Sequence, residues 1–237
     1  MGVTYEIRTS DAPLIERVWR SQSSGQDTLV AIAVAQLNLV VWQDGDKTRV
    51  SIQGPETEAR RAPLPDHTDF FGIVFNPGVH LPHLPASQLV NGDVTLPEAS
   101  SRSFWLQGAA WEIPTYDNAE AFVARLGRDE LLFEEPVVAA ALRGESPDMS
   151  SRSIQRRFLY ATGLTHRTIR QIDRARQATV RLQEGAPIAD VAYASGYFDQ
   201  AHMTHALKHY IGYTPVQLMD ADTSEPLSLL YKTASSG

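Results

Sequence analysis

Residues 188–215 constrain the fold of this chain more than any other segment. Ile188 and Val191 share one face of a predicted helix, and Gly196 interrupts that helix with a residue that accepts the positive φ of a sharp turn. Asp199 is placed to cap a second helix, because its carboxylate can accept hydrogen bonds from the free amides of the first turn. The segment therefore predicts a helix, a tight turn and a second helix.

The second predicted helix separates apolar from polar side chains. We expect its buried face to contain Met203, Ala206, Leu207 and Tyr210. We expect its exposed face to contain Gln200, Ala201, His202, His205, Lys208 and His209. A polar helix that a scaffold helix holds at a fixed angle is how many proteins read DNA in the major groove.

The same segment resembles the signature of AraC-type (AraC/XylS) bacterial transcription regulators. The resemblance is carried by residues 196–208, Gly-Tyr-Phe-Asp-Gln-Ala-His-Met-Thr-His-Ala-Leu-Lys, and by residues 212–215, Gly-Tyr-Thr-Pro. Residues 149–158 resemble the recognition helix of the family's first helix-turn-helix unit, and residues 161–165 resemble its end. Residues 172–178 resemble the long helix that joins the two units in this family.

The predicted fold class is α+β, with two domains and a tail. Strand patterns favour a mixed α/β, strand-rich regulatory domain over residues 1–134. The resemblance implies an all-α DNA-binding domain with two helix-turn-helix units over residues 135–220, and a C-terminal tail follows over 221–237. We expect the connecting helix over residues 167–184, with a length of roughly 27 Å at 1.5 Å per residue.

The charge distribution supports this division. The whole chain carries a net charge of −7, which by itself argues against nucleic acid. Residues 1–147, however, contain 11 Lys and Arg against 20 Asp and Glu, whereas residues 148–220 contain 9 against 6. An acidic half joined to a basic half is typical of a regulator whose C-terminal half meets phosphates.

Hydrophobic patterns predict the main elements of the N-terminal half. We expect a strand over residues 29–42, a hairpin partner over 48–53 and another strand over 69–75. A short helix is expected over 84–89, and an amphipathic helix over 119–126. The buried stripe of the amphipathic helix is expected to contain Ala119, Phe122, Val123 and Leu126.

The first helix-turn-helix unit departs from the usual spacing. Pro136 begins a predicted helix over residues 137–142, but the break before the next helix extends from 142 to 150. A usual turn takes about three or four residues, so we expect the scaffold helix of this unit to be displaced or poorly formed.

Composition and motifs exclude several other classes. The chain has no cysteine, which excludes disulfides, thiolate metal sites and cysteine nucleophiles, and fits a cytoplasmic location. Residues 1–13 lack the apolar core of a signal peptide, and residues 29–42 are too short and polar to span a bilayer. No nucleophile elbow, phosphate-binding loop or dinucleotide fingerprint occurs. We therefore expect no enzyme activity, no cofactor and no membrane partner.

The N-terminal half resembles one subgroup of the family, distinct from the arabinose type. Residues 54–57, 71–78 and 93–96 carry this resemblance. It implies that the domain binds a small-molecule effector, forms a homodimer, or does both. Double-stranded DNA and RNA polymerase are the other partners that the resemblance implies.

The resemblance also implies which residues contact DNA. The base-reading residues that it assigns are Arg152, Gln155, Arg156, Gln200, Ala201, His202 and His205. Arginine can bind guanine, and glutamine can bind adenine, in a bidentate manner. Ala201 and His205 replace a serine and an arginine that are common in relatives, so we expect weaker discrimination from the second unit. We assign phosphate contacts to Arg170, Arg174, Arg181 and Lys208; for the three arginines a solvated helix face is an equal alternative.

Aromatic and histidine residues suggest two further kinds of site in the N-terminal half. Those that could line an effector pocket, or equally form core, are Trp19, Trp42, Phe71, Phe75, Trp105 and Trp111. His67, Asp69, His80 and His83 suggest a zinc or iron site, although Pro82 separates the last pair; ordinary histidines are favoured, and no metal is assigned. Two rival functions remain: a constitutive dimeric DNA binder, and a small metal-dependent barrel enzyme fused to a DNA-binding domain.

Overall fold

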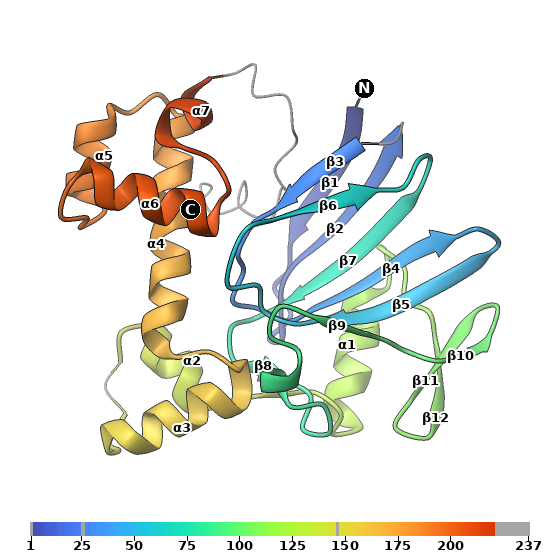
Figure 1. Cartoon of the computed structure of the whole chain (residues 1–237). Helices are drawn as coiled ribbons and strands as arrows, with labels where there is room; N and C mark the ends of the chain where they lie inside the picture. The colour runs from blue at the N-terminus through green and yellow to red at the C-terminus, as the bar shows by residue number, and fades with distance from the viewer. Residues whose placement is uncertain (1, 25–26, 146, 221–237) are drawn as a thin grey trace. The chain divides into compact units, whose positions relative to one another are not determined.

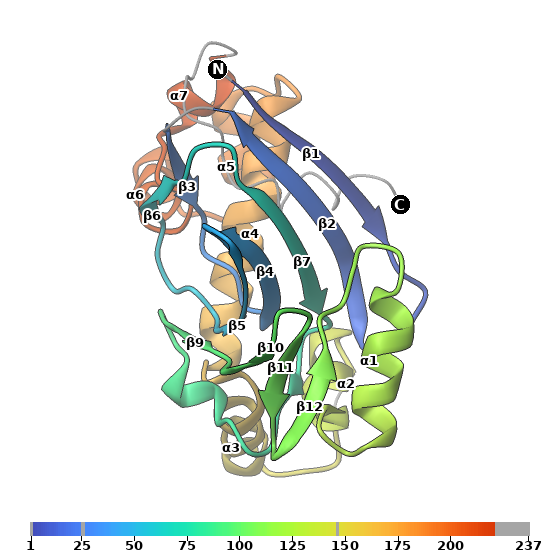
Figure 2. The same ribbon diagram turned by 90° about the vertical axis from the view of Figure 1, so that its right-hand side faces the viewer.

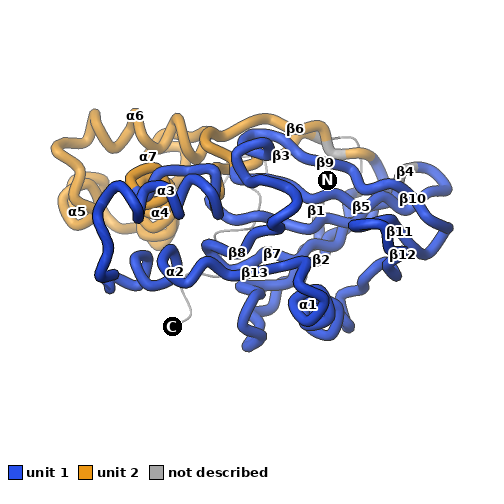
Figure 3. The backbone as a smooth tube through the Cα atoms, turned by 90° about the horizontal axis from the view of Figure 1, so that it is seen from below, with its two compact units in different colours: residues 1–25, 35–55, 66–166 blue, residues 26–34, 56–65, 167–237 orange. Residues whose placement is uncertain are grey.

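The computed structural model describes residues 2–24, 27–145 and 147–220 (Figure 1). Its contacts divide the chain into two compact units (Figure 3). Unit 1 contains residues 1–25, 35–55 and 66–166, and unit 2 contains residues 26–34, 56–65 and 167–237. The predicted domains over residues 1–134 and 135–220 stay a prediction, but the compact units cut across that boundary. The predicted tail, 221–237, lies outside the described residues.

Unit 1 is built around a six-stranded antiparallel sheet. In spatial order its strands are β1 (Gly2–Thr9), β2 (Ile15–Ser24), β7 (Asp69–Phe75), β4 (Asn38–Asp44), β5 (Lys47–Gln53) and β9 (Asp93–Thr95). β4 and β5 form the predicted hairpin, and Gly45 adopts a φ of 61° in its turn. The predicted strand over residues 69–75 is confirmed as β7.

Smaller sheets and helices complete unit 1. The sheets comprise β10 (Glu98–Ser100), β11 (Ser103–Leu106) and β12 (Ala109–Glu112), and the pair β8 (Val79–His80) and β13 (Phe133–Glu134). The helices are the 3-10 turn η1 (Ala86–Gln88), α1 (Ala119–Arg128), α2 (Pro136–Leu142) and α3 (Ser151–Thr162). All three predicted helices of this region, over residues 84–89, 119–126 and 137–142, are therefore confirmed.

The core of unit 1 lies between the sheet and α1 (Figure 2). The four residues of the predicted α1 stripe are buried, and they pack in one cluster with Val18, Leu39 and Ile73 from the sheet. Burial of a leucine- or phenylalanine-sized side chain contributes about 1.5–3 kcal/mol. The amphipathic pattern of this helix thus determines which face meets the sheet.

Unit 2 combines a two-stranded antiparallel ribbon with four helices. The ribbon consists of β3 (Asp27–Ala31) and β6 (Arg60–Leu64), and the helices are α4 (His166–Gln183), α5 (Ile188–Ala194), α6 (Gln200–Tyr210) and α7 (Pro215–Met219). The first residue of α4 belongs to unit 1. Val30, Ile32 and Val34 are buried in one cluster with Ala175, Leu207 and other helix residues. The core of the helical unit therefore includes residues from the N-terminal half of the chain.

The prediction of one strand over residues 29–42 is wrong. The structure ends β3 at Ala31 and begins β4 at Asn38, and the two strands belong to different sheets and different units. Between them, the Ala33 amide donates to the carbonyl of Tyr210 at 2.8 Å instead of to a neighbouring strand. A continuous apolar run indicates burial, but it does not specify which partner covers each residue.

The predicted α+β class is confirmed, because a strand-rich N-terminal region precedes a C-terminal helical region. α4 has 18 residues, which gives the expected length of about 27 Å. In the described part of the chain, no helix combines the length and the apolar character needed to cross a bilayer.

Candidate nucleic-acid interface and ligand pocket

Helix α3, which was predicted to read DNA, exposes the three side chains that the sequence assigned to base contacts. Arg152, Gln155 and Arg156 are all exposed, whereas Phe158 is buried and stacks on His166 with ring centroids 4.9 Å apart. Spacings of three and four residues place the exposed three on one side of the helix. The helix thus presents two guanidinium groups and one amide to solvent while Phe158 anchors it.

Contacts within unit 1 hold α3 in place. Arg157 donates to both carboxylate oxygens of Glu135 at 2.9 Å, and Glu135 also accepts from the Val137 amide at the start of α2. Tyr160 lies edge-on to His80 of β8, with centroids 5.1 Å apart. The long break of the first helix-turn-helix unit is confirmed, but α2 is formed and paired with α3 through this ion pair.

The C-terminal end of α3 requires glycine. Gly163 has a φ of +68°, and its amide donates to the carbonyl of Leu159. A Cβ at this position would lie 2.9 Å from the backbone carbonyl of Ala86 and 2.7 Å from Val90. Glycine therefore permits both the left-handed cap and the close approach of α3 to η1.

Helix α6, the second helix predicted to read DNA, also has the predicted faces. Asp199 accepts from the His202 amide at 2.7 Å, which confirms the expected cap. Met203, Ala206 and Leu207 are buried, as predicted, and Tyr210 is half-buried and donates to Gln171 of α4. The exposed side chains are the predicted ones: Gln200, Ala201, His202, His205, Lys208 and His209. α6 thus matches a reading helix in cap, core and exposed surface.

The β3–β6 ribbon contacts the C-terminal end of α6, a feature that the sequence analysis missed. The amides of Ala33 and Ala59 donate to the last carbonyls of α6, on Tyr210 and His209, each at 2.8 Å. A Cβ on Gly212, which has a φ of +89°, would lie 2.9 Å from Val30. Residues of the N-terminal half therefore satisfy helix-terminal carbonyls that have no partner within the helix.

The four cations assigned to phosphate differ in their surroundings. Arg170, Arg181 and Lys208 are exposed. Arg174 is half-buried: its guanidinium lies 4.3 Å from the ring centre of Tyr197 and donates to the carbonyl of Gly196 at 3.3 Å. Arg174 therefore links α4 to the turn between α5 and α6, whereas the other three are available to a ligand.

Two aromatic side chains of unit 2 are unusually exposed. Phe198, which directly precedes the capping residue of α6, is 92% exposed, and Tyr193 at the end of α5 is 89% exposed. Phenylalanine can contact the methyl group of thymine in the major groove. The residue type alone gave no signal for this exposure, because aromatic side chains are on average highly buried.

The histidines do not form a metal centre in the described residues. No group of three or more histidine and acidic side chains in this part of the chain is arranged to hold a metal ion. His80 is buried with its Nδ1 3.3 Å from the carbonyl of Gly78, and His67 is exposed. Asp69 accepts a hydrogen bond from Gln22 instead of joining these histidines.

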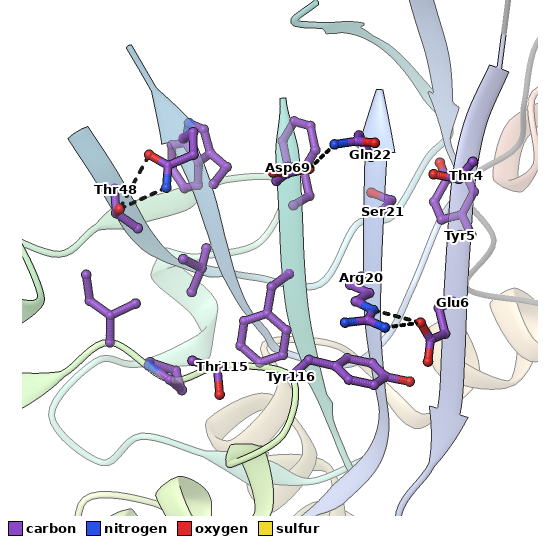
Figure 4. A pocket seen from close by; sticks show the side chains of 17 residues that line it. Thr4, Tyr5, Glu6, Arg20, Ser21, Gln22, Thr48, Asp69, Thr115 and Tyr116 are labelled. Atoms are coloured by element: carbon purple, nitrogen blue, oxygen red, sulfur yellow. Dashed lines mark hydrogen bonds and ion pairs between the residues drawn. The ribbon is translucent and has the colours of Figure 1, made fainter. Parts of the chain in front are cut away.

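Unit 1 contains a pocket of about 670 Å³ over the sheet (Figure 4). Its walls come from β1, β2, β4, β5, β7 and the segment of residues 113–116. Arg20 donates from Nε to Glu6 at 2.7 Å and lies 4.6 Å from the ring centre of Tyr116. Burial raises the pKa of the Tyr116 phenol, and the nearby Glu6 carboxylate raises it further. The pocket therefore combines apolar walls with pairs of polar side chains.

Two of the six aromatic residues assigned to a pocket line this one. Trp42 and Phe71 are lining residues. Phe75 and Trp111 are 1% and 2% exposed in the core of unit 1, and Trp105 is 45% exposed on β11. The ring of Trp19 lies over Gly72, because a Cβ there would approach it to 2.2 Å. The sequence identified the aromatic residues but not the face of the sheet on which each lies.

A network beside the pocket supports its wall. Arg8 donates to the Tyr116 carbonyl at 2.7 Å and also pairs with Glu120 at the start of α1. The hydrogen bond from Arg8 lowers the pKa of Glu120 to about 2. The carboxylate therefore remains charged when ordinary glutamates are already protonated.

We expect this ion pair to make the stability of the protein depend on pH. Because the folded-state pKa is lowered, the contribution is present above the ordinary value near 4.5 and is lost as the pH falls toward about 2. Urea midpoints measured between pH 2 and 6 should therefore fall less steeply for Glu120→Gln than for the wild type, and should be lower for the variant at the upper end. Parallel pH profiles would contradict this assignment.

Comparisons with known proteins agree with the geometry of the helical region. Residues 146–221 match a family model described as a helix-turn-helix domain. No curated protein sequence gave a significant match to the chain. The chain thus contains a helix-turn-helix DNA-binding domain. This domain is of the type found in AraC-type transcription regulators, as the motifs in residues 196–208 and 212–215 indicate.

Several solved structures of ToxT from Vibrio cholerae are similar to this chain. Strain O395 ToxT is 9% identical over 91% of this chain and 96% of that one, with a TM-score of 0.40. Strain O395 ToxT bound to (E)-4-(8-methylnaphthalen-1-yl)but-3-enoic acid is 11% identical over 91% of this chain and 98% of that one, with a TM-score of 0.41. Wild-type ToxT from strain SCE256 bound to an unsaturated fatty acid is 11% identical over 91% of this chain and 94% of that one, with a TM-score of 0.38. At these identities and TM-scores the similarity carries no functional argument.

Proposed function

We propose that this protein is a sequence-specific transcription regulator that reads DNA with α3 and α6 and responds to a small molecule bound in the pocket of unit 1. The exposed polar faces of two capped helices, each anchored by a buried apolar face, carry the first part of the proposal. Recognition helices of helix-turn-helix proteins place such faces in the major groove. The pocket of about 670 Å³ carries the second part, because it has the size of a ligand site.

The two reading helices belong to different units, which gives the effector a means of action. α3 is held in unit 1, the unit that contains the pocket, and α6 is held in unit 2. A ligand can alter DNA affinity only if it binds more tightly to one arrangement of these helices than to another. Homodimer formation and a contact with RNA polymerase are parts of the same proposal, which the AraC-type domain supports.

Selection of bound fragments from random DNA tests the first part. The full chain should enrich one DNA sequence motif over bulk competitor at ordinary ionic strength. When Arg156 is changed, the base preference at one or two positions of that motif should weaken. Failure to enrich any sequence would overturn sequence-specific binding. A DNA affinity that no pocket ligand changes would instead favour the constitutive dimeric binder.

We expect two of the three α4 arginines assigned to phosphate to contact DNA and the third to stabilise the fold. Arg170→Ala and Arg181→Ala should weaken binding to all DNA sequences similarly, and each should reduce the slope of log affinity against log salt by about one. Arg174→Ala should instead lower the unfolding free energy by about 0.5–2 kcal/mol, because its guanidinium stacks on Tyr197. Salt titrations of DNA binding and urea unfolding of the three variants distinguish the two roles. If Arg174→Ala kept the wild-type stability but reduced the slope of log DNA affinity against log salt, Arg174 would be a phosphate contact.

A further inference from the structure

The strand register identifies the side chains that form the pocket floor. Cross-strand partners in an antiparallel sheet share a face. Arg20 pairs with Phe71, and Gln22 pairs with Asp69, across β2 and β7. Val41 of β4 pairs with Phe71 as well. All five residues line the pocket, so its floor combines a guanidinium, an amide and a carboxylate with an aromatic and an aliphatic side chain.

The positive charge of this floor is already neutralised. Arg20 forms an ion pair with Glu6 and lies against the ring of Tyr116, so the Glu6 carboxylate offsets the charge of its guanidinium. It is the single arginine or lysine among the lining residues that the structure describes. A carboxylate or phosphate ligand that approached Arg20 would therefore also lie close to the Glu6 carboxylate, which repels it.

The negative charge of the floor is less completely balanced. Glu6 and Asp69 are the two carboxylates of the described lining, against one guanidinium, which leaves a net charge of −1. Asp69 accepts a hydrogen bond from the neutral amide of Gln22 at 2.8 Å (Figure 4). The sequence around the pocket adds to this field, because residues 1–147 carry 20 acidic and 11 basic side chains.

Asp69 is exposed, and the pocket that it lines also has apolar walls. Phe71 and Val41 lie on the floor, and Ile113, Pro114 and the ring of Tyr116 come from the segment that follows β12. Aromatic faces attract cations as well as apolar groups, because the face of the ring is the negative end of its quadrupole. The walls therefore fit an apolar body, and the floor fits one positive charge.

We propose that the pocket binds an organic cation that carries an apolar, preferably aromatic, body, with its positive charge at Asp69. This inference rests on the proposed function, in which the pocket is the effector site, and it names the chemical class of the effector. A lipophilic anion of the same shape would meet the Asp69 carboxylate without a free cation to compensate it, so the charge of the ligand decides binding.

Two ions of nearly the same shape and opposite charge test the proposal. Tetraphenylphosphonium and tetraphenylborate are titrated into the full chain, and binding is followed by calorimetry. We expect the phosphonium to bind about two- to fivefold more tightly than the borate, as expected for one exposed ion pair. Asp69→Asn should remove most of this preference. Asp93→Asn, which changes an exposed carboxylate of β9 outside the lining, should retain it.

Equal or tighter binding of the borate, binding of neither ion, or an unchanged preference in Asp69→Asn overturns the proposal. The affinity of the same protein for its selected DNA is measured with and without the phosphonium. A cation preference with unchanged DNA affinity would support the pocket chemistry and count against the effector role in the proposed function. Control of DNA affinity by a different compound, without phosphonium binding, would overturn only the ligand class.

Discussion

Ile32→Ala is expected to destabilise the DNA-binding helices of unit 2 by about 2–5 kcal/mol, although residue 32 lies far from them in the sequence. Ile32 is 1% exposed and packs in the same cluster as Ala175, Leu207 and Ile211. Removal of its side chain leaves a cavity among residues of α4 and α6, and the loss exceeds that of the buried area alone. Urea unfolding of the full chain, followed by circular dichroism, measures the effect.

A matched substitution distinguishes this role from a general sensitivity to lost methyl groups. Val94→Ala shortens an aliphatic side chain of β9 that is 38% exposed, and it should change the unfolding free energy by no more than about 0.5 kcal/mol. DNA affinity should fall for Ile32→Ala at temperatures where the variant is partly unfolded, and should be unchanged for Val94→Ala. Equal stability of the two variants would show that Ile32 does not contribute to the core of unit 2.

Arg156→Ala is expected to weaken binding to the preferred DNA sequence by about 1–3 kcal/mol, which is a factor of about 5 to 150 in affinity. Arg156 is exposed on α3 beside Arg152 and Gln155, while the neighbouring Arg157 is engaged with Glu135. Because a bidentate arginine contact discriminates guanine from other bases, specificity should relax at one or two base pairs. Parallel selection experiments with wild type and variant measure this change.

Arg128→Ala is the matched control for the loss of one exposed positive charge. Arg128 lies in the last turn of α1, outside the helices assigned to DNA, and is also exposed. Its removal should leave the selected motif unchanged. If Arg156→Ala weakened all sequences equally, as a lost phosphate contact does, Arg156 would be a phosphate contact and not a base-reading residue.

The local sequence was sufficient to predict both reading helices. In α6, the cap at Asp199, the buried residues Met203 and Leu207 and the exposed face all follow from residues within a few turns of one another. The same holds for α1, whose four-residue stripe is buried as predicted. Helix periodicity, caps and turn glycines act over short distances, so a single sequence contains the information needed to place them.

The partners of the strands could not be predicted in the same way. The apolar run of residues 29–42 is divided between the ribbon of unit 2 and the sheet of unit 1. The pocket depends on the register of five strands, which brings Glu6, Arg20 and Asp69 to one surface from positions up to 63 residues apart. Strand alternation shows that two faces exist, but it does not show which face is covered.

By itself, the sequence determined the helix-turn-helix class of residues 146–221, the two helices that we propose to read DNA and the side chains that they expose, because these depend on contacts between near neighbours in the chain. Only the tertiary structure decided that Val30, Ile32 and Val34 complete the core of unit 2, that Arg174 contacts Tyr197, and which side chains meet in the pocket. These features arise when segments distant in the sequence exclude water from a shared surface. Which segments pack together depends on how the whole chain fills its core.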